Sequence, residues 1–513
     1  MKLGSLFSGM AQRRADNVSI ICKDRRITFR ELERTTNRIA NALLARGLKP
    51  LDRMALWVPN SAEIVEAMGG VVKMGGIIVP ISTRLTLAEV QFILGDVEPR
   101  VVFFSPETRK GAREAAAKMD NPVLIVTEGA AEPGEIALST LAAEGSEAQP
   151  PFLPAEPDDC LIAYTSGTTG HPKGAISTHA SLVFSAGFLN ATEFQVTSDD
   201  AILVTTPIAH RIGLSRITNM LTTGCRLVIM TRFDPAEAVD LIEKEKVTIL
   251  GCVPTVVRLM MPEIEKRPQA LKSLRLISAT GEVFPVELKK RLFEAVPDVG
   301  IYSYYAGTEP ASVCALLPHE QRGNPGSMGR AIPGVEVRLV DQELNDVPLG
   351  TTGEILVRCG RPGLFTMMKG YYKRPEANKE VFVQDGWLRT GDLAYKDAEG
   401  YYYFADRAKD MVVSGGFNIY SKEVELALLS HAAVADAAVV GIPDEEYGEA
   451  VVAFIESKPG MTATPEEIIE HCRDKIASYK KPRHVLFIPT LPRTGTGKVQ
   501  KGELRKIAAA ETA

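Results

Sequence analysis

The sequence predicts an α/β protein with mainly parallel sheets, built as more than one domain. Apolar strand-like runs alternate with helical segments over most of the chain, an order typical of parallel sheets covered by helices. The 513 residues exceed what a single hydrophobic core usually holds. We therefore expect a large α/β body and at least one further domain.

Composition excludes several functional classes. The chain is 45% hydrophobic and 24% charged, as soluble globular proteins are. A net charge of −5 and 6% aromatic residues favour neither nucleic acid nor anionic lipid as a partner. The seven cysteines form no C-x-x-C pair, and no stretch has the apolar length of a transmembrane helix or signal peptide. We expect a cytoplasmic protein without a transmembrane segment or nucleic-acid partner.

The N-terminal elements follow from capping and periodicity. Thr28-Phe-Arg-Glu is a capping box, and apolar residues at helical spacing continue from it to Gly47. Residues 128–159 are rich in Ala, Glu, Pro and Gly and are expected to form a surface connection. The other expected elements are strands at 54–58, 77–81, 101–104 and 123–126 and a helix at 62–73.

The same rhythm continues to the C-terminus. Strands are expected at 161–163, 202–205, 225–230, 247–250, 274–278 and 300–303, with a helix at 235–244. Residues 409–513 form an α/β unit of their own in this prediction. Its elements are a helix at 422–429, strands at 434–440 and 450–456, and a helix at 465–476.

A glycine-rich and hydroxyl-rich segment follows the apolar run at 161–163. Residues 164–174 read Tyr-Thr-Ser-Gly-Thr-Thr-Gly-His-Pro-Lys-Gly. Glycines let backbone N–H groups converge, hydroxyls add donors and Lys173 adds positive charge, so the segment favours binding of a polyphosphate. It lacks the Gly-Lys-Ser/Thr ending of a Walker A loop. A flexible surface turn would also explain the composition.

A second polar cluster, residues 304–309, reads Tyr-Tyr-Ala-Gly-Thr-Glu and stands where a strand is expected to end. α/β sheets usually bind ligands at that edge. An aromatic ring such as Tyr305 can cover adenine, Thr308 can donate to phosphate, and Glu309 can hold Mg²⁺. Alternatively, the tyrosines are core residues and Glu309 is a helix N-terminal charge.

Three further stretches place polar residues beside glycines. Residues 387–393 read Trp-Leu-Arg-Thr-Gly-Asp-Leu, which sets a carboxylate in a turn. Residues 406–418 run from charged residues into a Gly-Gly pair, which also fits an exposed hairpin. Residues 492–498, Pro-Arg-Thr-Gly-Thr-Gly-Lys, present one lysine, although a lysine near a chain end is most often only solvated.

In this order, these five stretches resemble the signature motifs of the adenylate-forming superfamily of acyl-CoA synthetases, nonribosomal adenylation domains and luciferases. The resemblance covers nearly the whole chain and is strongest to fatty-acid or aryl-acid CoA ligases. It implies a large multi-subdomain N-terminal domain, 1–408, and a small mobile α+β domain, 409–513, joined at the hinge residue Lys409. Ala306 departs from the glycine that is usual at its position.

The resemblance also implies residue roles. Lys498, Glu309 and His210 are the expected catalytic residues, and Thr168 and Glu309 the expected Mg²⁺ ligands. Gly415 and Gly416 would border the pantetheine arm of CoA. The residues expected to bind ATP or CoA are Thr165, Ser166, Gly167, Thr168, Thr169, Gly170, Lys173, Tyr305, Thr308, Asp392, Arg407, Gly415 and Gly416.

The expected chemistry explains why these groups are needed. A carboxylate attacks the α-phosphate of ATP and gives an acyl-adenylate and pyrophosphate. Mg²⁺ and Lys498 stabilise the negative charge that gathers in the transition state. Rotation about Lys409 would then exchange Lys498 for a thiol.

The acyl site is expected around His210, in a Pro-x-x-His-x-x-Gly stretch that resembles the family's, although a lone histidine near apolar residues is more often a core residue. Related benzoate-type ligases have an apolar residue where this chain has Arg211, and a guanidinium there is costly unless paired. One hypothesis is that Arg211, with Arg216, recognises a second polar or acidic group of the acid. The alternative is that Arg211 points to solvent or pairs with a carboxylate.

Three other residues are expected to shape that pocket. Gly251 would widen it, Tyr304 would narrow it, and Ala306 alters its backbone. These opposed effects leave open whether the acid is fatty, aryl, dicarboxylic or steroid-derived.

We therefore expect an ATP-dependent acid:CoA ligase that uses ATP, Mg²⁺ and CoA with a small carboxylic acid and could act as a homodimer. An adenylating enzyme that transfers the acyl group to a carrier protein is the alternative within the class. A catalytically silent nucleotide-binding protein is the alternative from another class.

Overall fold

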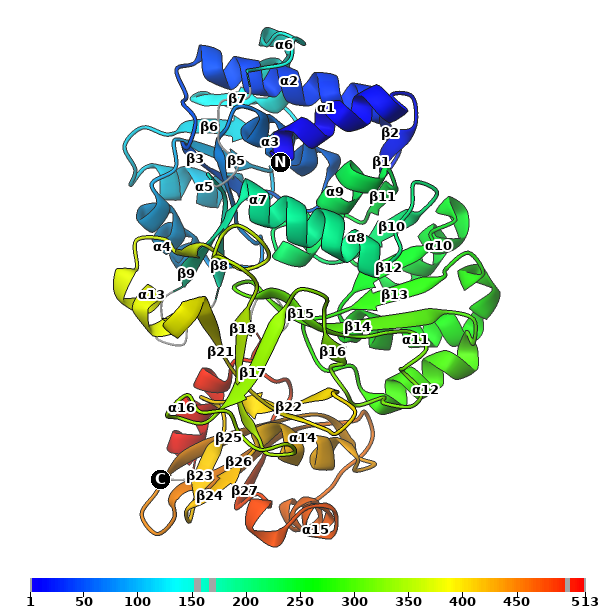
Figure 1. Ribbon diagram of the computed structural model, residues 1–513, viewed down its shortest axis with the longest axis vertical. Helices are drawn as coiled ribbons and strands as arrows, with labels where there is room; N and C mark the ends of the chain where they lie inside the picture. Colours follow the sequence, from blue (N-terminus) through cyan, green and yellow to red (C-terminus); the bar gives the residue numbers. More distant parts are fainter. Residues whose placement is uncertain (1, 152–157, 166–171, 494–498, 512–513) are drawn as a thin grey trace. The chain divides into compact units, whose positions relative to one another are not determined.

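The computed structural model describes residues 2–151, 158–165, 172–493 and 499–511. The chain forms two compact units, Met1–Val337 with Val357–Leu388, and Arg338–Leu356 with Arg389–Ala513. Both units are mixed α/β, which confirms the predicted fold class (Figure 1). The division by contacts does not coincide with a boundary after residue 408, so that boundary stays a prediction.

The first sheet of the larger unit has nine strands in the order β16-β15-β14-β13-β12-β10-β11-β1-β2. Pairing is parallel from β14 to β1, while β2, β15 and β16 add antiparallel edges. Its strands are β1 (Val18–Cys22), β2 (Arg25–Thr28), β10 (Ala201–Val204), β11 (Arg226–Ile229), β12 (Ile249–Cys252), β13 (Leu276–Ala279), β14 (Gly300–Gly307), β15 (Ala311–Leu316) and β16 (Arg330–Ala331).

The second sheet has eight strands in the order β19-β9-β8-β4-β3-β5-β6-β7. It is parallel from β8 to β7, and β9 and β19 close one edge in antiparallel pairing. Its strands are β3 (Arg53–Trp57), β4 (Ile77–Pro80), β5 (Val101–Phe104), β6 (Val123–Val126), β7 (Glu135–Ala137), β8 (Asp159–Thr165), β9 (Lys173–Thr178) and β19 (Gly370–Tyr371).

Helices cover these sheets, and one of them begins with the capping box that the sequence predicts. At the start of α2, Thr28 and Glu31 form the expected reciprocal capping box. The helices of this unit are α1 (Leu3–Arg14), α2 (Phe29–Ala45), α3 (Ala62–Lys73), α4 (Leu87–Val97), α5 (Arg109–Ala116), α6 (Leu138–Glu144), α7 (His179–Leu182), the π-helix η1 (Val183–Leu189), α8 (Asn190–Glu193), α9 (Arg211–Thr223), α10 (Pro235–Glu245), α11 (Pro254–Lys266), η2 (Pro268–Leu271), α12 (Val286–Ala295) and α13 (Pro375–Val381).

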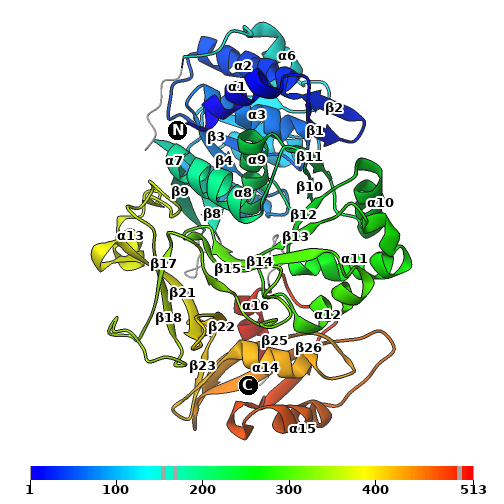
Figure 2. The same cartoon turned by 45° about the vertical axis from the view of Figure 1, so that its right-hand side comes forward.

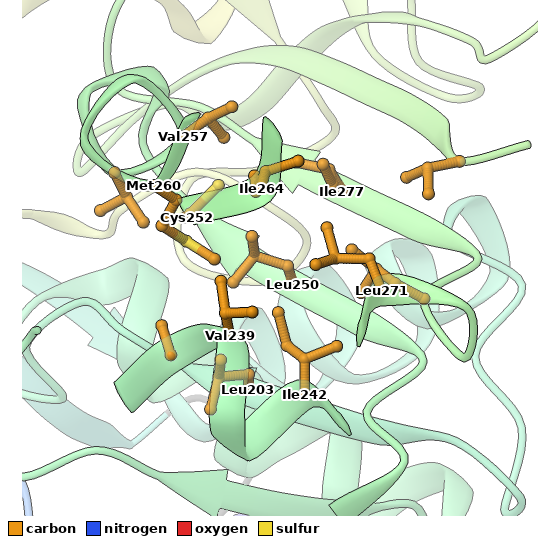
Figure 3. Packing of buried hydrophobic residues seen from close by; sticks show 14 of the residues in the cluster. Leu203, Val239, Ile242, Leu250, Cys252, Val257, Met260, Ile264, Leu271 and Ile277 are labelled. Atoms are coloured by element: carbon orange, nitrogen blue, oxygen red, sulfur yellow. The ribbon is translucent and has the colours of Figure 1, made fainter. Parts of the chain in front are cut away.

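A large apolar core fixes the strands of the first sheet. Figure 2 shows α10, α11 and α12 along one side of β12, β13 and β14. Leu203, Leu250 and Ile277 of the strands pack with Ile242 of α10 and Met260 of α11, and all five are buried (Figure 3). Burying one such side chain contributes about 1.5–3 kcal/mol. This core positions the carboxyl ends of the parallel strands, where the candidate site residues lie.

The smaller unit is built on a five-stranded sheet in the order β24-β23-β26-β25, with β27 paired to β26. Alternate residues of β25 and β26 face opposite sides, so α14 and α15 bury one face and α16 buries the other. Its elements are β23 (Val412–Ser414), β24 (Phe417–Ile419), α14 (Ser421–Leu429), β25 (Val434–Asp444), β26 (Gly448–Ser457), α15 (Pro465–Lys475), η4 (Ser478–Lys480), β27 (His484–Phe487) and α16 (Lys501–Glu511).

A further sheet has the strand order β17-β18-β21-β20, with β22 paired to β21. Its elements are β17 (Glu336–Val340), β18 (Gly353–Arg358), β20 (Phe382–Val383), η3 (Gln384–Gly386), β21 (Trp387–Lys396) and β22 (Tyr402–Arg407). Among the helices in the described ranges, none combines the length and apolarity needed to cross a bilayer.

Two local predictions were wrong. The connection expected over 128–159 contains β7 and α6, because β7 adds a parallel strand beside β6 and α6 packs on α2. The strand expected at 300–303 continues to Gly307, because β15 pairs with it and extends the ladder through the polar cluster. Most of residues 304–309 are therefore strand, and a turn begins at Thr308.

Candidate active site

Glu309 lies in the turn between β14 and β15, and two hydroxyl groups bind its carboxylate. Thr165 Oγ1 donates to Glu309 Oε1 over 3.2 Å, and the Tyr371 hydroxyl donates to the same oxygen over 3.0 Å. Thr165 ends β8, and Tyr371 belongs to β19 at the edge of the same sheet. The sheets thus bring the start of the expected phosphate loop to the carboxylate of the 304–309 cluster.

Lys173 adds positive charge at the same place. It begins β9, where it pairs in register with Thr165 of β8, and its Nζ lies 5.4 Å from the centre of the Tyr371 ring. The expected site residues Ser166, Gly167, Thr168, Thr169 and Gly170 lie outside the described residues. The two ends of the segment that carries them are therefore adjacent, beside a lysine, a carboxylate and two hydroxyl groups.

Tyr371 was missed by the sequence analysis. It stands in the run Gly-Tyr-Tyr at 370–372, which has no periodicity and no chemistry that marks a site. Burial and the neighbouring Glu309 carboxylate raise the pKa of Tyr371, so its phenol stays protonated and donates the hydrogen bond. Only the antiparallel placement of β19 beside β9 brings it to Glu309.

Tyr164 anchors β8 directly before the glycine-rich segment. Its hydroxyl donates to Asp96 Oδ2 over 2.7 Å, and Arg374 Nη2 lies 3.0 Å from the other oxygen of Asp96. Burial and Asp96 raise the pKa of Tyr164, which keeps it a neutral donor. The hydrogen bond to Asp96 therefore fixes the side chain of Tyr164, the residue at the start of the glycine-rich segment.

Arg211 is the first residue of α9 and binds four acceptors of the protein. Nη1 donates to Ser177 Oγ over 2.7 Å and to the Thr308 carbonyl over 3.2 Å. Nη2 donates to Ser185 Oγ and to the Thr366 carbonyl, each over 3.2 Å. Burial lowers the pKa of Arg211 to about 10, while the Glu309 charge acts in the opposite direction. Arg211 therefore ties α9 to β9, η1 and the Thr308 turn, and His210 is the N-cap residue just before it.

Arg216 lies one and a half turns further along α9 and is 1% exposed. Its Nη2 donates to Ser278 Oγ over 3.2 Å, and its guanidinium lies 5.3 Å from the centre of the Phe194 ring. A Cβ at Gly251 would stand 2.6 Å from Arg216 Nε. The guanidinium of Arg216 therefore occupies the space that a side chain at Gly251 would take. Burial raises the pKa of Tyr304, and Arg216 opposes this shift.

Tyr305 and Ala306 of β14 lie opposite an irregularity of β15. The register between β14 and β15 shifts between these two residues, and both are half-buried. Ala306 is the position that departs from the resembled motif, and the extra residue at this irregularity is Val313 of the partner strand β15.

The smaller unit holds the remaining expected residues. Asp392 of β21 pairs in register with Arg407 of β22, and Arg407 Nε lies 3.3 Å from Asp392 Oδ1. Burial lowers the pKa of Lys409, whose carbonyl accepts from Arg505 Nη2 over 3.1 Å. Lys498 lies outside the described residues.

Gly415 and Gly416 form the two-residue turn of the β23–β24 hairpin. Their φ angles are +58° and +81°, which suits a type I′ turn and favours glycine. The hairpin that the Gly-Gly pair suggested is thus present. Its role beside a pantetheine arm stays a prediction.

Comparison with known proteins identifies the family of this chain. Residues 7–372 match the family model described as AMP-binding enzyme, and residues 423–498 match the AMP-binding enzyme C-terminal domain. A feruloyl-CoA synthase of an Amycolatopsis species is 34% identical over 484 residues, 94% of each chain. An indoleacetate–CoA ligase of Aromatoleum aromaticum is 34% identical over 497 residues, 95% of this chain and 94% of that one.

The solved structures agree with this result. The ATP-bound crystal structure of MatB from Rhodopseudomonas palustris superposes with a TM-score of 0.89, at 30% identity and over 100% of both chains. Fold and family match the resemblance drawn from the motifs. The chain belongs to the AMP-binding enzyme family, the adenylate-forming enzymes.

Proposed function

We propose that this member of the family is an ATP-dependent acid:CoA ligase. It would form an acyl-adenylate from a carboxylic acid and then the CoA thioester, with release of AMP and pyrophosphate. The observation that carries the proposal is the convergence of Thr165, Lys173 and Tyr371 of the second sheet with Glu309, in the turn after β14 of the first sheet. Relatives matched along nearly their whole length are named as CoA ligases, which supports CoA as the acceptor.

In the first step, the described residues bind and orient ATP. Lys173 and the hydroxyl of Thr165 stand where a polyphosphate chain would be held by the glycine-rich segment. Arg211 fixes the carbonyl of Thr308 and so positions the turn that carries Glu309. Fixed dipoles and charges of this kind lower the barrier because they need not reorganise during the reaction.

The residues also fit Mg²⁺. The described residues contain no group of three or more His, Cys, Asp or Glu side chains that could hold a metal alone. Mg²⁺ usually binds one or two carboxylates together with substrate phosphates, and Glu309 supplies one such carboxylate. Glu309 would hold the ion, with Thr168 as a further proposed ligand. When bound, Mg²⁺ supplies positive charge that neutralises phosphate oxygens.

The other roles implied by the resemblance are part of the same proposal. Asp392 and Arg407 would bind the ribose, and their pairing in register supports a shared function. Lys498 would stabilise the charge at the α-phosphate, and His210 would lie beside the acyl group. Lys409 would be the hinge between domains 1–408 and 409–513.

The test is AMP release by the purified protein with ATP, Mg²⁺ and a panel of fatty, aryl and dicarboxylic acids, with and without CoA. We expect one acid class to give CoA-dependent AMP release. Replacing Lys498 by Ala should abolish it. The matched control is Lys506→Ala on α16, an exposed lysine that pairs with Glu503.

Two results would contradict the proposal. Acid-dependent pyrophosphate exchange without a CoA effect would instead favour transfer to a carrier protein. Absence of AMP with every acid would favour a silent nucleotide-binding protein. A homodimer is a separate prediction, which light scattering of the eluted protein tests.

A further inference from the structure

Arg216 is a buried cation that uses little of its hydrogen-bonding capacity. Its Nη2 donates to Ser278 Oγ, whereas within the described residues Nε and Nη1 have no hydrogen-bond partner. Among the described residues, Arg216 forms no ion pair with a carboxylate. A guanidinium remains charged at any pH that proteins experience, so it cannot avoid this cost by losing a proton. Buried charges in native proteins are usually paired, which indicates a partner outside the chain.

Three other cations of the same unit, two buried and one partly buried, have protein acceptors, and one of them has a carboxylate partner. Lys73 pairs with Glu33 and also donates to Asn37 Oδ1 over 2.6 Å. Lys289 donates to the Pro325 carbonyl over 2.6 Å. Arg211 uses its guanidinium on four protein acceptors. Arg216 differs from these three because two of its nitrogens, Nε and Nη1, have no hydrogen-bond partner among the described residues.

Arg216 reaches the ligand-binding edge of the first sheet. It contacts residues at or near the carboxyl ends of three adjacent strands, Gly251 of β12, Ser278 of β13 and Tyr304 of β14. The carboxyl ends of parallel strands are where α/β sheets bind their ligands. The strand that carries Tyr304, β14, continues into the turn that contains Glu309. Arg216 therefore contacts the same strand that leads to the proposed ATP site.

The surroundings are shaped for a guanidinium. A side chain at Gly251 would overlap it, since a Cβ would stand 2.6 Å from Nε and 3.0 Å from Cζ. The ring of Phe194 lies 5.3 Å from it, which suits cation–π contact. A glycine, a hydroxyl and an aromatic ring thus hold the charge in place without neutralising it.

We propose that Arg216 binds a second anionic group, a carboxylate or sulfonate, on the acid that the enzyme activates. The proposal rests on the proposed ligase function and names its substrate class. The oxygens of the second group would accept hydrogen bonds from Nε or Nη1, while the first carboxylate reacts with ATP. Arg216 is then a specificity-determining residue, and Arg211 is a positioning residue for the Thr308 turn.

The experiment compares matched substrates. The wild-type enzyme is assayed by CoA-dependent AMP release with ω-dicarboxylic acids, their monomethyl esters and monocarboxylic acids of equal length. An ω-sulfo acid tests whether the site recognises charge or carboxylate shape. We expect kcat/KM for the diacid to exceed that for its ester by at least about tenfold, as a charge-assisted hydrogen bond predicts.

The variant Arg216→Met keeps an unbranched side chain, although a shorter one, and removes the charge and the hydrogen-bond donors. It should lose that preference, by a fall in kcat/KM for the diacid and an equal or higher value for the monoacid. The control Arg258→Met removes an exposed arginine of α11 and should leave the ratio unchanged. A structural role alone would change thermal stability without changing the ratio. If Arg216→Met does not fold, the inference is tested by the ratio of kcat/KM for the diacid to that for the monoacid, measured in Arg216→Lys and in the wild-type enzyme.

The outcomes separate this inference from the function on which it rests. A wild-type enzyme that turns over monoacids at least as well as diacids would overturn the inference and keep the ligase. A diacid preference that survives in Arg216→Met would overturn it as well. Absence of AMP release with every acid would instead overturn the proposed function.

Discussion

Replacing Tyr371 by Phe tests whether the contact at Glu309 serves ATP chemistry. The change deletes one hydroxyl and keeps the ring that Lys173 approaches. It removes one of two hydroxyl donors to Glu309 Oε1, the bond of 3.0 Å. A hydrogen bond to a charged group contributes about 1.5–3 kcal/mol, and about 1.4 kcal/mol corresponds to a tenfold change. We therefore expect the adenylation step to slow by about tenfold to a hundredfold.

The assay is ATP–pyrophosphate exchange at varied Mg²⁺ concentration with a saturating acid. We expect Tyr371→Phe to need more Mg²⁺ for half-maximal rate, because Glu309 is less firmly oriented. Tyr372→Phe is the matched control, since it deletes a hydroxyl from the adjacent tyrosine. Thr165→Val removes the second donor, and a double variant shows whether the two contacts act together.

Equal exchange rates and equal Mg²⁺ dependence in Tyr371→Phe and Tyr372→Phe would refute the reasoning. The contact would then be a feature of the ligand-free protein without a role in the reacting complex. A loss of thermal stability in Tyr371→Phe with unchanged kinetics would show a structural role only.

Three further predictions concern residues around the site. Gly251→Ala should lower the free energy of unfolding by about 1–3 kcal/mol, because its Cβ would stand 2.6 Å from Arg216 Nε. The control Gly95→Ala in α4 should stabilise the protein slightly, because its Cβ meets nothing within 4 Å. Calorimetric melting temperatures that fall equally in both variants would contradict this prediction. Arg211→Lys should reduce kcat about tenfold with little change in KM for the acid, because one ammonium group cannot replace the four hydrogen bonds of the guanidinium. A change mainly in the KM for the acid would instead place Arg211 in the acyl pocket. Burial lowers the pKa of His179 from 6.5 to about 4, so the unfolded chain binds the proton more readily than the folded one. The free energy of unfolding should therefore fall by up to about 3 kcal/mol as the pH falls from 6.5 to 4. His179→Leu should show a smaller drop in melting temperature over that pH range, and a drop identical to that of the wild type would exclude this cause.

Much of the fold could be predicted because its signals are local. The capping box at Thr28, the apolar runs that became β3 to β6, and the Gly415–Gly416 turn each depend on residues a few positions apart. The same holds for the motif stretches, whose order along the chain indicated the family that the comparisons confirm. The expected acid:CoA ligase activity agrees with the named relatives.

Other features could not be read from local patterns. The extension of β14 to Gly307 requires β15 as a partner, and β7 and α6 form where the composition suggested a connection. Arg211 and Arg216 lie close together in the sequence but differ in their hydrogen bonds. Arg211 donates to four protein acceptors, whereas Arg216 donates to Ser278, and the sequence contains no pattern that distinguishes the two arginines.

The sequence by itself determined the class of chemistry, because the glycines, hydroxyls and charges of each motif stand next to one another in the chain. Only the tertiary structure decided which groups meet. Glu309 receives hydrogen bonds from residues 144 and 62 positions away, Thr165 and Tyr371. Residues so far apart in the sequence come into contact only because of the order of strands in the two sheets. Burial of the apolar faces of the sheets and hydrogen bonding of the backbone determine that order.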